Sequence, residues 1–176
     1  MPGKITVRRV CAGEWEQLRV IRLRALADAP MAFGSTLAAE QAQPDEFWRG
    51  RAAGGATDEN RASFIAEHDG EWVGISTCLL EEGGVGERPA WVFGMWVDPV
   101  ARRQGAAQAL LRALTGWARG RGANVLNLHV TETNAPAIAL YERLGFRATG
   151  QTELLPHTPS LRENHMACRL DDFNWQ

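Results

Sequence analysis

The chain has 176 residues, of which 45% are hydrophobic and 23% charged, values typical of a folded globular protein rather than a disordered one. Its 19 basic and 21 acidic residues give a net charge of -2, which argues against a nucleic-acid partner because binding to phosphate backbones requires a cationic excess. No apolar stretch approaches the ~20 residues that cross a bilayer, and the first residues lack the apolar core of a secretion signal. We therefore expect one domain over residues 1–176, in the cytoplasm and with no membrane partner.

The cysteines and histidines predict neither disulfides nor a metal site. The three cysteines are odd in number and far apart, so reduced thiols are expected. The four histidines show no spacing typical of metal ligands.

The first predicted elements are a strand and two helices. Residues 4–10 alternate between apolar and polar side chains, as in a half-buried strand. Apolar residues recur every three or four positions over 13–28, which predicts an amphipathic helix. Pro44 and Asp45 are typical of a first helical turn and predict a short helix over 44–53.

Three strands are expected next. The segments 62–69 and 71–80 favour strands, and Asp69-Gly70 between them predicts a tight hairpin turn that needs positive φ. A third strand is expected over 89–99.

The rest of the chain alternates between helices and strands. An apolar stripe predicts a helix over 102–119, followed by a strand over 124–130. Pro136 near its start and Gly145 past its end bound a helix over 135–144. The last predicted strands are 146–152 and 164–170. Polar or glycine-rich segments predict loops at 54–60, 82–88 and 156–163.

This order of elements, β-α-α-β-β-β-α-β-α-β-β, predicts an α/β (α+β) fold. We expect a mixed, mostly antiparallel twisted sheet of six or seven strands with helices on both faces. The strand–helix–strand unit over 89–130 should form a parallel pair through a right-handed crossover.

The segment 97–107, VDPVARRQGAA, has the features of an anion-binding loop. It joins a buried strand to a helix, and the first amides of a helix lack intrahelical partners and carry the positive end of the helix dipole. Gly105 permits close approach, and Arg102 and Arg103 add charge, so a pyrophosphate would fit. The alternative is that Gly105 only eases helix packing and the arginines are solvated. The segment is neither a Walker A loop nor a Gly-x-Gly-x-x-Gly loop.

Two motifs in this chain resemble those of a known family. Arg102-x-x-Gly105-x-Ala107, after Val97-Asp98-Pro99, is similar to the acyl-CoA pyrophosphate loop of the GNAT N-acetyltransferase superfamily. Downstream, the segment from Asn134 through Leu140-Tyr141 to Gly145-Phe146 resembles that family's pattern Asn-x-x-Ala-x-x-Leu-Tyr-x-x-x-Gly-Phe. The resemblance implies acetyl-CoA as co-substrate and allows a homodimer; no metal is expected, because the histidines are scattered.

The resemblance also implies which residues hold acetyl-CoA. The backbone of the strand end is expected to contact the pantetheine arm and the acetyl carbonyl, and the loop amides are expected to bind the pyrophosphate with help from Arg102. These residues are Met95, Trp96 and Val97 on the strand and Arg103, Gln104, Gly105, Ala106 and Ala107 on the loop. Asn134 is expected either to contact CoA or to cap the following helix. Gly94 marks either a bulge that frees an amide or a packing compromise.

Two side chains are the candidates for proton chemistry. By resemblance, Tyr141 is the general acid, because a phenol is protonated at neutral pH; the alternative is a core aromatic on an amphipathic helix. His129 occupies the strand position at which the ribosomal-protein N-terminal acetyltransferases carry a proposed glutamate base, and histidine titrates near neutral pH. The alternative is that His129 has a structural role and that a water chain serves as the base.

The acceptor is expected opposite CoA, over residues 28–48 and 153–163. Its candidate contacts are Phe33, Ser35, Glu40, Glu46, Phe47, Trp48, Glu153, His157 and Glu163. The preferred function is acetyl transfer to the primary amine of a small molecule by direct attack in a ternary complex. The alternatives are acetylation of a protein amino terminus and a non-catalytic acyl-CoA sensor.

Overall fold

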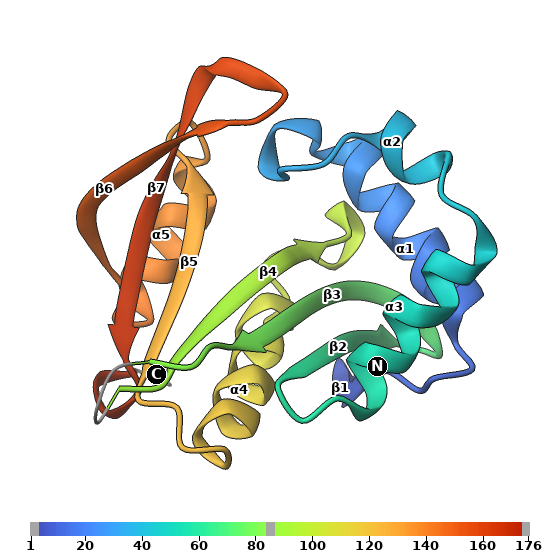
Figure 1. Ribbon diagram of the computed structural model, residues 1–176, viewed down its shortest axis with the longest axis horizontal. Helices are drawn as coiled ribbons and strands as arrows, with labels where there is room; N and C mark the ends of the chain where they lie inside the picture. The colour runs from blue at the N-terminus through green and yellow to red at the C-terminus, as the bar shows by residue number, and fades with distance from the viewer. Residues whose placement is uncertain (1–3, 84–86, 174–176) are drawn as a thin grey trace.

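A computed structural model describes residues 4–83 and 87–173 and shows a single seven-stranded sheet with helices on both faces (Figure 1). The strand order is β1-β2-β3-β4-β5-β7-β6. The strands are β1 (Thr6–Arg9), β2 (Arg61–His68), β3 (Glu71–Leu80), β4 (Pro89–Val97), β5 (Val125–Thr131), β6 (Arg147–Leu155) and β7 (Thr158–Arg169). The helices are α1 (Trp15–Asp28), α2 (Leu37–Gln41), α3 (Asp45–Thr57), α4 (Ala106–Arg119) and α5 (Ala135–Arg143), with 3-10 turns η1 (Pro30–Ala32), η2 (Pro99–Ala101) and η3 (Leu170–Asp172).

The mixed, mostly antiparallel sheet confirms the predicted fold class. Only β4 and β5 pair in parallel among the described strands, as the strand–helix–strand unit predicted. Their pairing runs from Pro89↔Val125 to Val92↔Leu128 and stops there. Beyond that point the two strands diverge, and Figure 1 shows them fanning apart.

Two apolar layers hold helices against the sheet. On one face, Leu110, Leu111 and Leu114 of α4 are fully buried in a cluster that also includes Tyr141 of α5. On the other face, α1 and α3 pack over β2 and β3, with Leu18 and Ile21 at the centre of that cluster. The apolar stripes that predicted these helices are therefore the surfaces that form the core.

The hairpin between β2 and β3 forms as predicted. Asp69 and Gly70 both have positive φ, 51° and 84°, the geometry of the tight two-residue turn that matches strand twist.

Two predicted helix boundaries are wrong. The second long helix does not end at residue 53 but continues through the two glycines to Thr57, so 54–57 is not a loop. Helix α4 begins at Ala106 rather than at residue 102, because Gly105 has a φ of 85° that no helix accommodates. The preceding residues form the turn η2, in which Asp98 accepts a hydrogen bond from the Val100 amide at 3.0 Å.

Three further segments differ from expectation or fall outside the described ranges. Helix α2 was not predicted; Thr36 caps it by accepting from the Ala39 amide, and it is too short for a periodic pattern. The predicted loop at 156–163 is mostly strand, because β6 and β7 pair almost to their turn, with Leu155 opposite Thr158. The predicted loop at 82–88 includes residues 84–86, which lie outside the described ranges.

Within residues 4–83 and 87–173, no helix is both long and apolar enough to span a bilayer. The same residues bring together no group of three His, Cys, Asp or Glu side chains suited to a metal. All three cysteines are free thiols, Cys78 and Cys168 buried and Cys11 exposed.

Candidate active site

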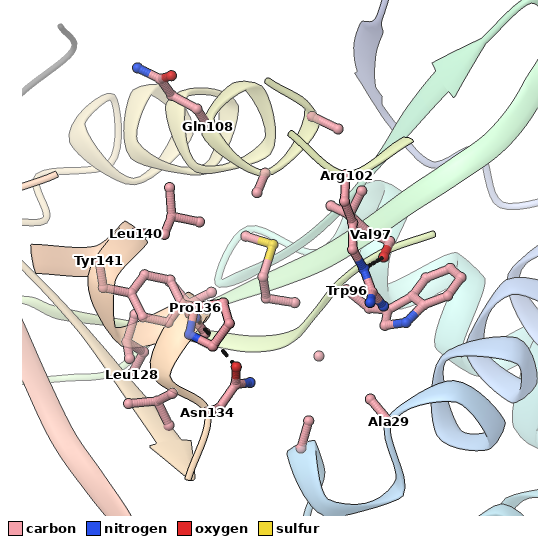
Figure 2. A pocket seen from close by; sticks show the side chains of 18 of the residues that line it. Ala29, Trp96, Val97, Arg102, Gln108, Leu128, Asn134, Pro136, Leu140 and Tyr141 are labelled. Carbon is pink, nitrogen blue, oxygen red and sulfur yellow. Dashed lines mark hydrogen bonds between the residues drawn. The ribbon is translucent and has the colours of Figure 1, made fainter. Parts of the chain in front are cut away.

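A pocket of about 980 Å³ opens where β4 and β5 separate. Its walls are the ends of the two strands, the start of α4, one side of α5 and the segment after α1. Figure 2 shows Leu140 and Tyr141 on one side of the pocket and Trp96, Val97 and Arg102 on the other. The pocket thus brings together every predicted catalytic and cofactor-binding residue except Gln104, whose side chain instead donates to the Val100 carbonyl at 2.8 Å.

The start of α4 presents unpaired backbone amides to the pocket. Gly105 is its N-cap, and the first helical residues, Ala106 and Ala107, also line the cavity. A Cβ placed on Gly105 would meet no atom within 4 Å, so the space in front of this backbone is open. Arg103, with a positive φ of 61°, lies beside it. This end of the pocket suits a phosphate or another anion because amides and helix dipole act together.

Arg102 is held by other groups of the protein. Its Nε donates to the Val97 carbonyl at 2.9 Å, and its Nη2 forms an ion pair with Asp28. The indole of Trp96 donates to the same carboxylate at 2.9 Å. Asp28 therefore joins the end of α1 to the end of β4 and neutralises much of the charge that Arg102 could offer to an anion. Sequence reasoning missed Asp28, which carries no signal beyond its place at the end of a predicted helix.

Gly94 lies in a β-bulge of β4, with a φ of 61°. Ile75 pairs with Trp96 and Thr77 with Phe93, so Gly94 and Met95 together lie opposite one residue of β3. The bulge interrupts the β3–β4 ladder at the pocket wall, and both Gly94 and Met95 line the cavity. The sequence allowed either a bulge or a packing compromise at Gly94, and the structure has the bulge.

Tyr141 contributes a buried phenol to the pocket. Its side chain is only 6% exposed and packs edge-on against Phe146, with ring centroids 5.6 Å apart. Burial raises the pKa of Tyr141 to about 12, because the phenolate would lose its hydration. The hydroxyl therefore keeps its proton throughout the neutral range.

His129 lies one residue beyond the last β4–β5 pair. Its neighbours Leu128 and Val130 belong to the cluster under α4, so strand alternation directs His129 to the opposite face of the sheet. There its ring centroid lies 5.2 Å from that of Trp91, and its Nε2 lies 4.0 Å from a Glu153 carboxylate oxygen. His129 also lines the pocket, so it stands at the boundary between the pocket and the second face of the sheet.

Asn134 caps α5 and also lines the pocket. Its side-chain oxygen accepts from the Ala137 amide at 3.3 Å, as Figure 2 shows. The capping role that the sequence allowed is thus present.

Two of the candidate acceptor residues turn out to be structural. Glu40 is 5% exposed and is bound by Arg22 at 2.7 Å and by Arg51 at 3.0 Å. Burial alone would raise the pKa of Glu40, but the two guanidiniums hold it below its usual value. Trp48 is completely buried. Neither side chain is placed to meet an acceptor.

Two of the remaining candidates, His157 and Phe33, meet at the turn between β6 and β7, whereas Glu46 and Phe47 lie on α3. His157 donates from Nε2 to the Phe33 carbonyl at 2.6 Å, and Thr131 donates to the Met31 carbonyl at 2.6 Å. These bonds tie the segment after α1 to β5 and to the β6–β7 turn, which approach each other in Figure 1. The two hydrogen bonds form a bridge across the second face of the sheet, the face covered by α1 and α3, at that end.

Comparison with known proteins adds a family and several relatives. The family model described as "Acetyltransferase (GNAT) family" matches residues 22–146. The mycothiol acetyltransferase of Thermomonospora curvata is 33% identical over 148 residues, which cover 83% of this chain and 45% of that protein. The chain thus spans about half the length of the curated relatives that it matches.

Solved structures show the same fold. A GNAT-family acetyltransferase from Streptococcus pneumoniae superposes with a TM-score of 0.77 over 94% of this chain and 99% of that one, at 17% identity. Nourseothricin acetyltransferase superposes with a TM-score of 0.55 over 64% of this chain and 67% of that one, at 31% identity.

Proposed function

Because the chain belongs to the GNAT family of acetyltransferases, we propose that it transfers the acetyl group of acetyl-CoA to the primary amine of a small molecule. The observation that carries the proposal is the pocket between the diverging ends of β4 and β5. The start of α4, the buried phenol of Tyr141 and the imidazole of His129, at the edge toward the second face of the sheet, all line this pocket. One N-acetyltransferase domain over residues 1–176 performs the reaction.

The pocket fits a long, anionic thioester. At one end, the backbone amides of residues 103–107 bind the pyrophosphate, in the open space that Gly105 leaves. Along the cavity, Met95, Trp96 and Val97 hold the pantetheine arm and polarise the acetyl carbonyl, and Asn134 contacts the carrier from the start of α5. Acetyl-CoA, when bound, supplies the activated acetyl group at the point where the strands separate.

His129 and Tyr141 perform the two proton tasks. The imidazole of His129 accepts the proton of the incoming ammonium, which frees the nitrogen for direct attack in a ternary complex. The N–C bond then forms as the C–S bond breaks, CoA leaves as a thiolate, and the surplus proton on the acylated nitrogen passes to water. Since the pKa of Tyr141 is about 12, its hydroxyl stays protonated and donates a hydrogen bond to the departing sulfur. This hydrogen bond stabilises the negative charge that develops on the sulfur as the C–S bond breaks.

The bridge across the second face of the sheet supports a small acceptor rather than a protein terminus. His157 and Thr131 hold the segment after α1 in place through hydrogen bonds to the Phe33 and Met31 carbonyls. The bridge occupies part of the approach that a folded protein substrate would need. Two similar proteins are named for mycothiol and for nourseothricin rather than for a protein substrate.

A cytoplasmic location is part of the proposal. It is supported by the three free thiols, because reduced cysteines are typical of a reducing compartment.

The test is thiol release from acetyl-CoA across matched panels of small amines and peptides, with the acetylated product identified by mass. Turnover of small amines is expected. Turnover confined to peptides would replace the proposal with acetylation of a protein amino terminus. Tight CoA binding without turnover on either panel would leave a non-catalytic acyl-CoA sensor.

A further inference from the structure

Four rings from three strands, including that of His129, lie together on the face of the sheet opposite α4. The Trp91 ring stacks on Phe93 with centroids 6.4 Å apart and on His165 with centroids 5.1 Å apart. His129 completes the group, 5.2 Å from Trp91 and 5.5 Å from His165. This ring platform, formed by Trp91, Phe93, His129 and His165, extends from the proposed base to an exposed ring. The side chain of Phe93 is 46% exposed.

Hydrogen bonds hold two rings of the platform, those of His165 and Trp91, in place. The Nε2 of His165 donates to the Asn127 side-chain oxygen at 2.9 Å, and its Nδ1 lies 3.0 Å from the Thr149 hydroxyl and 3.2 Å from the Gln151 side-chain oxygen. Burial, together with the nearby His129, lowers the pKa of His165. Trp91 donates from its indole to Glu81 at 3.0 Å. The rings of Trp91 and His165 are therefore held in place by hydrogen bonds at their nitrogen atoms.

Two carboxylates face each other at the border of this platform. Glu153 of β6 pairs directly with Glu163 of β7, and like charges in such a pair repel each other. Burial raises the pKa of Glu163; the charges of His129 and His157 oppose that rise, and the charge of Glu153 adds to it. Glu153 is also the carboxylate 4.0 Å from His129. The arrangement concentrates negative charge beside rings whose faces attract cations.

We infer that the acceptor is a dicationic amine, with one ammonium reacting at His129 and a second cationic group bound between the ring platform and the Glu153–Glu163 pair. The inference rests on the proposed acetyl transfer and specifies its substrate class. A cation at this position relieves the repulsion between the two carboxylates and gains attraction from the aromatic rings beside them. A monoamine of the same length lacks both contributions.

Putrescine and butylamine provide a matched pair of probes, because they share one carbon chain and differ by the second ammonium. Calorimetric titration of the CoA-saturated protein is expected to show putrescine binding about tenfold more tightly than butylamine. Trp91→Leu and Glu153→Gln should each remove most of that preference. Phe93→Leu, at a more exposed position, should reduce it severalfold and keeps the test valid if Trp91→Leu fails to fold. The matched control is Trp117→Leu on α4, where the ring instead lies under the guanidiniums of Arg9 and Arg121; its preference should be unchanged.

Equal affinities of the wild-type protein for the two amines would overturn the inference, as would a preference that survives both Phe93→Leu and Glu153→Gln. Thiol release measured on the same samples distinguishes a failure of the dicationic-acceptor inference from a failure of the proposed acetyl transfer. Platform-dependent putrescine binding without turnover would support the binding site and refute acetyl transfer. Equal turnover of butylamine and putrescine, unchanged in Glu153→Gln, would support acetyl transfer and refute the dicationic acceptor.

Discussion

Tyr141 is the only tyrosine in the chain, so its ionisation can be observed without interference from other phenols. Burial raises its pKa from 10.0 to about 12, which means that the fold favours the protonated form. The corresponding stabilisation is complete below pH 10 and is lost as the pH rises through about 12. A tyrosinate absorbance titration of the folded protein should therefore have its midpoint near 12 and shift to about 10 in denaturant. A native midpoint near 10 would mean that the hydroxyl is hydrated.

The same hydroxyl has a proposed role in turnover. Tyr141→Phe keeps the ring and its edge contact with Phe146 but removes the donor to the leaving sulfur. We expect kcat to fall by about tenfold or more, the usual contribution of a positioned proton donor, with the acetyl-CoA Kd unchanged. Steady-state kinetics and calorimetry measure the two quantities. An unchanged kcat would assign the role of Tyr141 to packing alone.

His129 is tested by the pH dependence of the rate. If its imidazole accepts the proton of the acceptor, His129→Ala should lose or displace the acidic limb of the pH–rate profile. His165→Ala provides a comparison, because it removes the neighbouring ring but leaves the proposed base in place. A profile of the His129 variant identical to that of the wild-type protein would assign the base to water.

At the scale of elements, α3 contains two adjacent glycines with different surroundings. A Cβ at Gly55 would lie 2.6 Å from Ser63 Oγ, whereas the nearest atom to a Cβ at Gly54 would be 3.9 Å away. Gly55→Ala should therefore lower the free energy of unfolding by about 1–3 kcal/mol through overpacking. Gly54→Ala should raise it by about 0.5–1 kcal/mol, because alanine favours the helix. Urea unfolding of the two variants checks both signs. Similar effects at the two positions would contradict the close contact between α3 and β2.

The same helix shows why some boundaries could not be predicted. Locally, Gly54-Gly55 favours a break, but the helix needs a residue without a side chain where it crosses Ser63 on β2. For β6 and β7, the sequence predicted a loop where the structure has strands. Their long hairpin is held by backbone pairing, and β6 is exposed along almost its whole length, so it has little hydrophobic alternation to detect. In both cases a contact distant in sequence decides the structure.

For the whole molecule, the order of elements and the parallel β4–β5 pair followed from local patterns, because periodicity and turn residues determine them. The residues of the pocket were predictable where a short motif carries them, as around Gly105 and Tyr141. The ion pair between Asp28 and Arg102 was not, because it joins two segments far apart in the chain. Glu40 was misjudged for the same reason, since only the fold reveals its two arginine partners.

The central claim is that an anionic carrier binds against the amides at the start of α4. Gly105 and Gly122 form a matched pair for testing it, with φ of 85° and 82° and no atom within 4 Å of an added Cβ at either position. Both substitutions to glutamate add the same strain and charge, but only Gly105 lines the pocket. Calorimetric titration with acetyl-CoA should show binding weakened by about tenfold or more in Gly105→Glu, through lost amide contacts and repulsion, and unchanged in Gly122→Glu. Equal affinity of the wild-type protein and Gly105→Glu for acetyl-CoA would contradict the account.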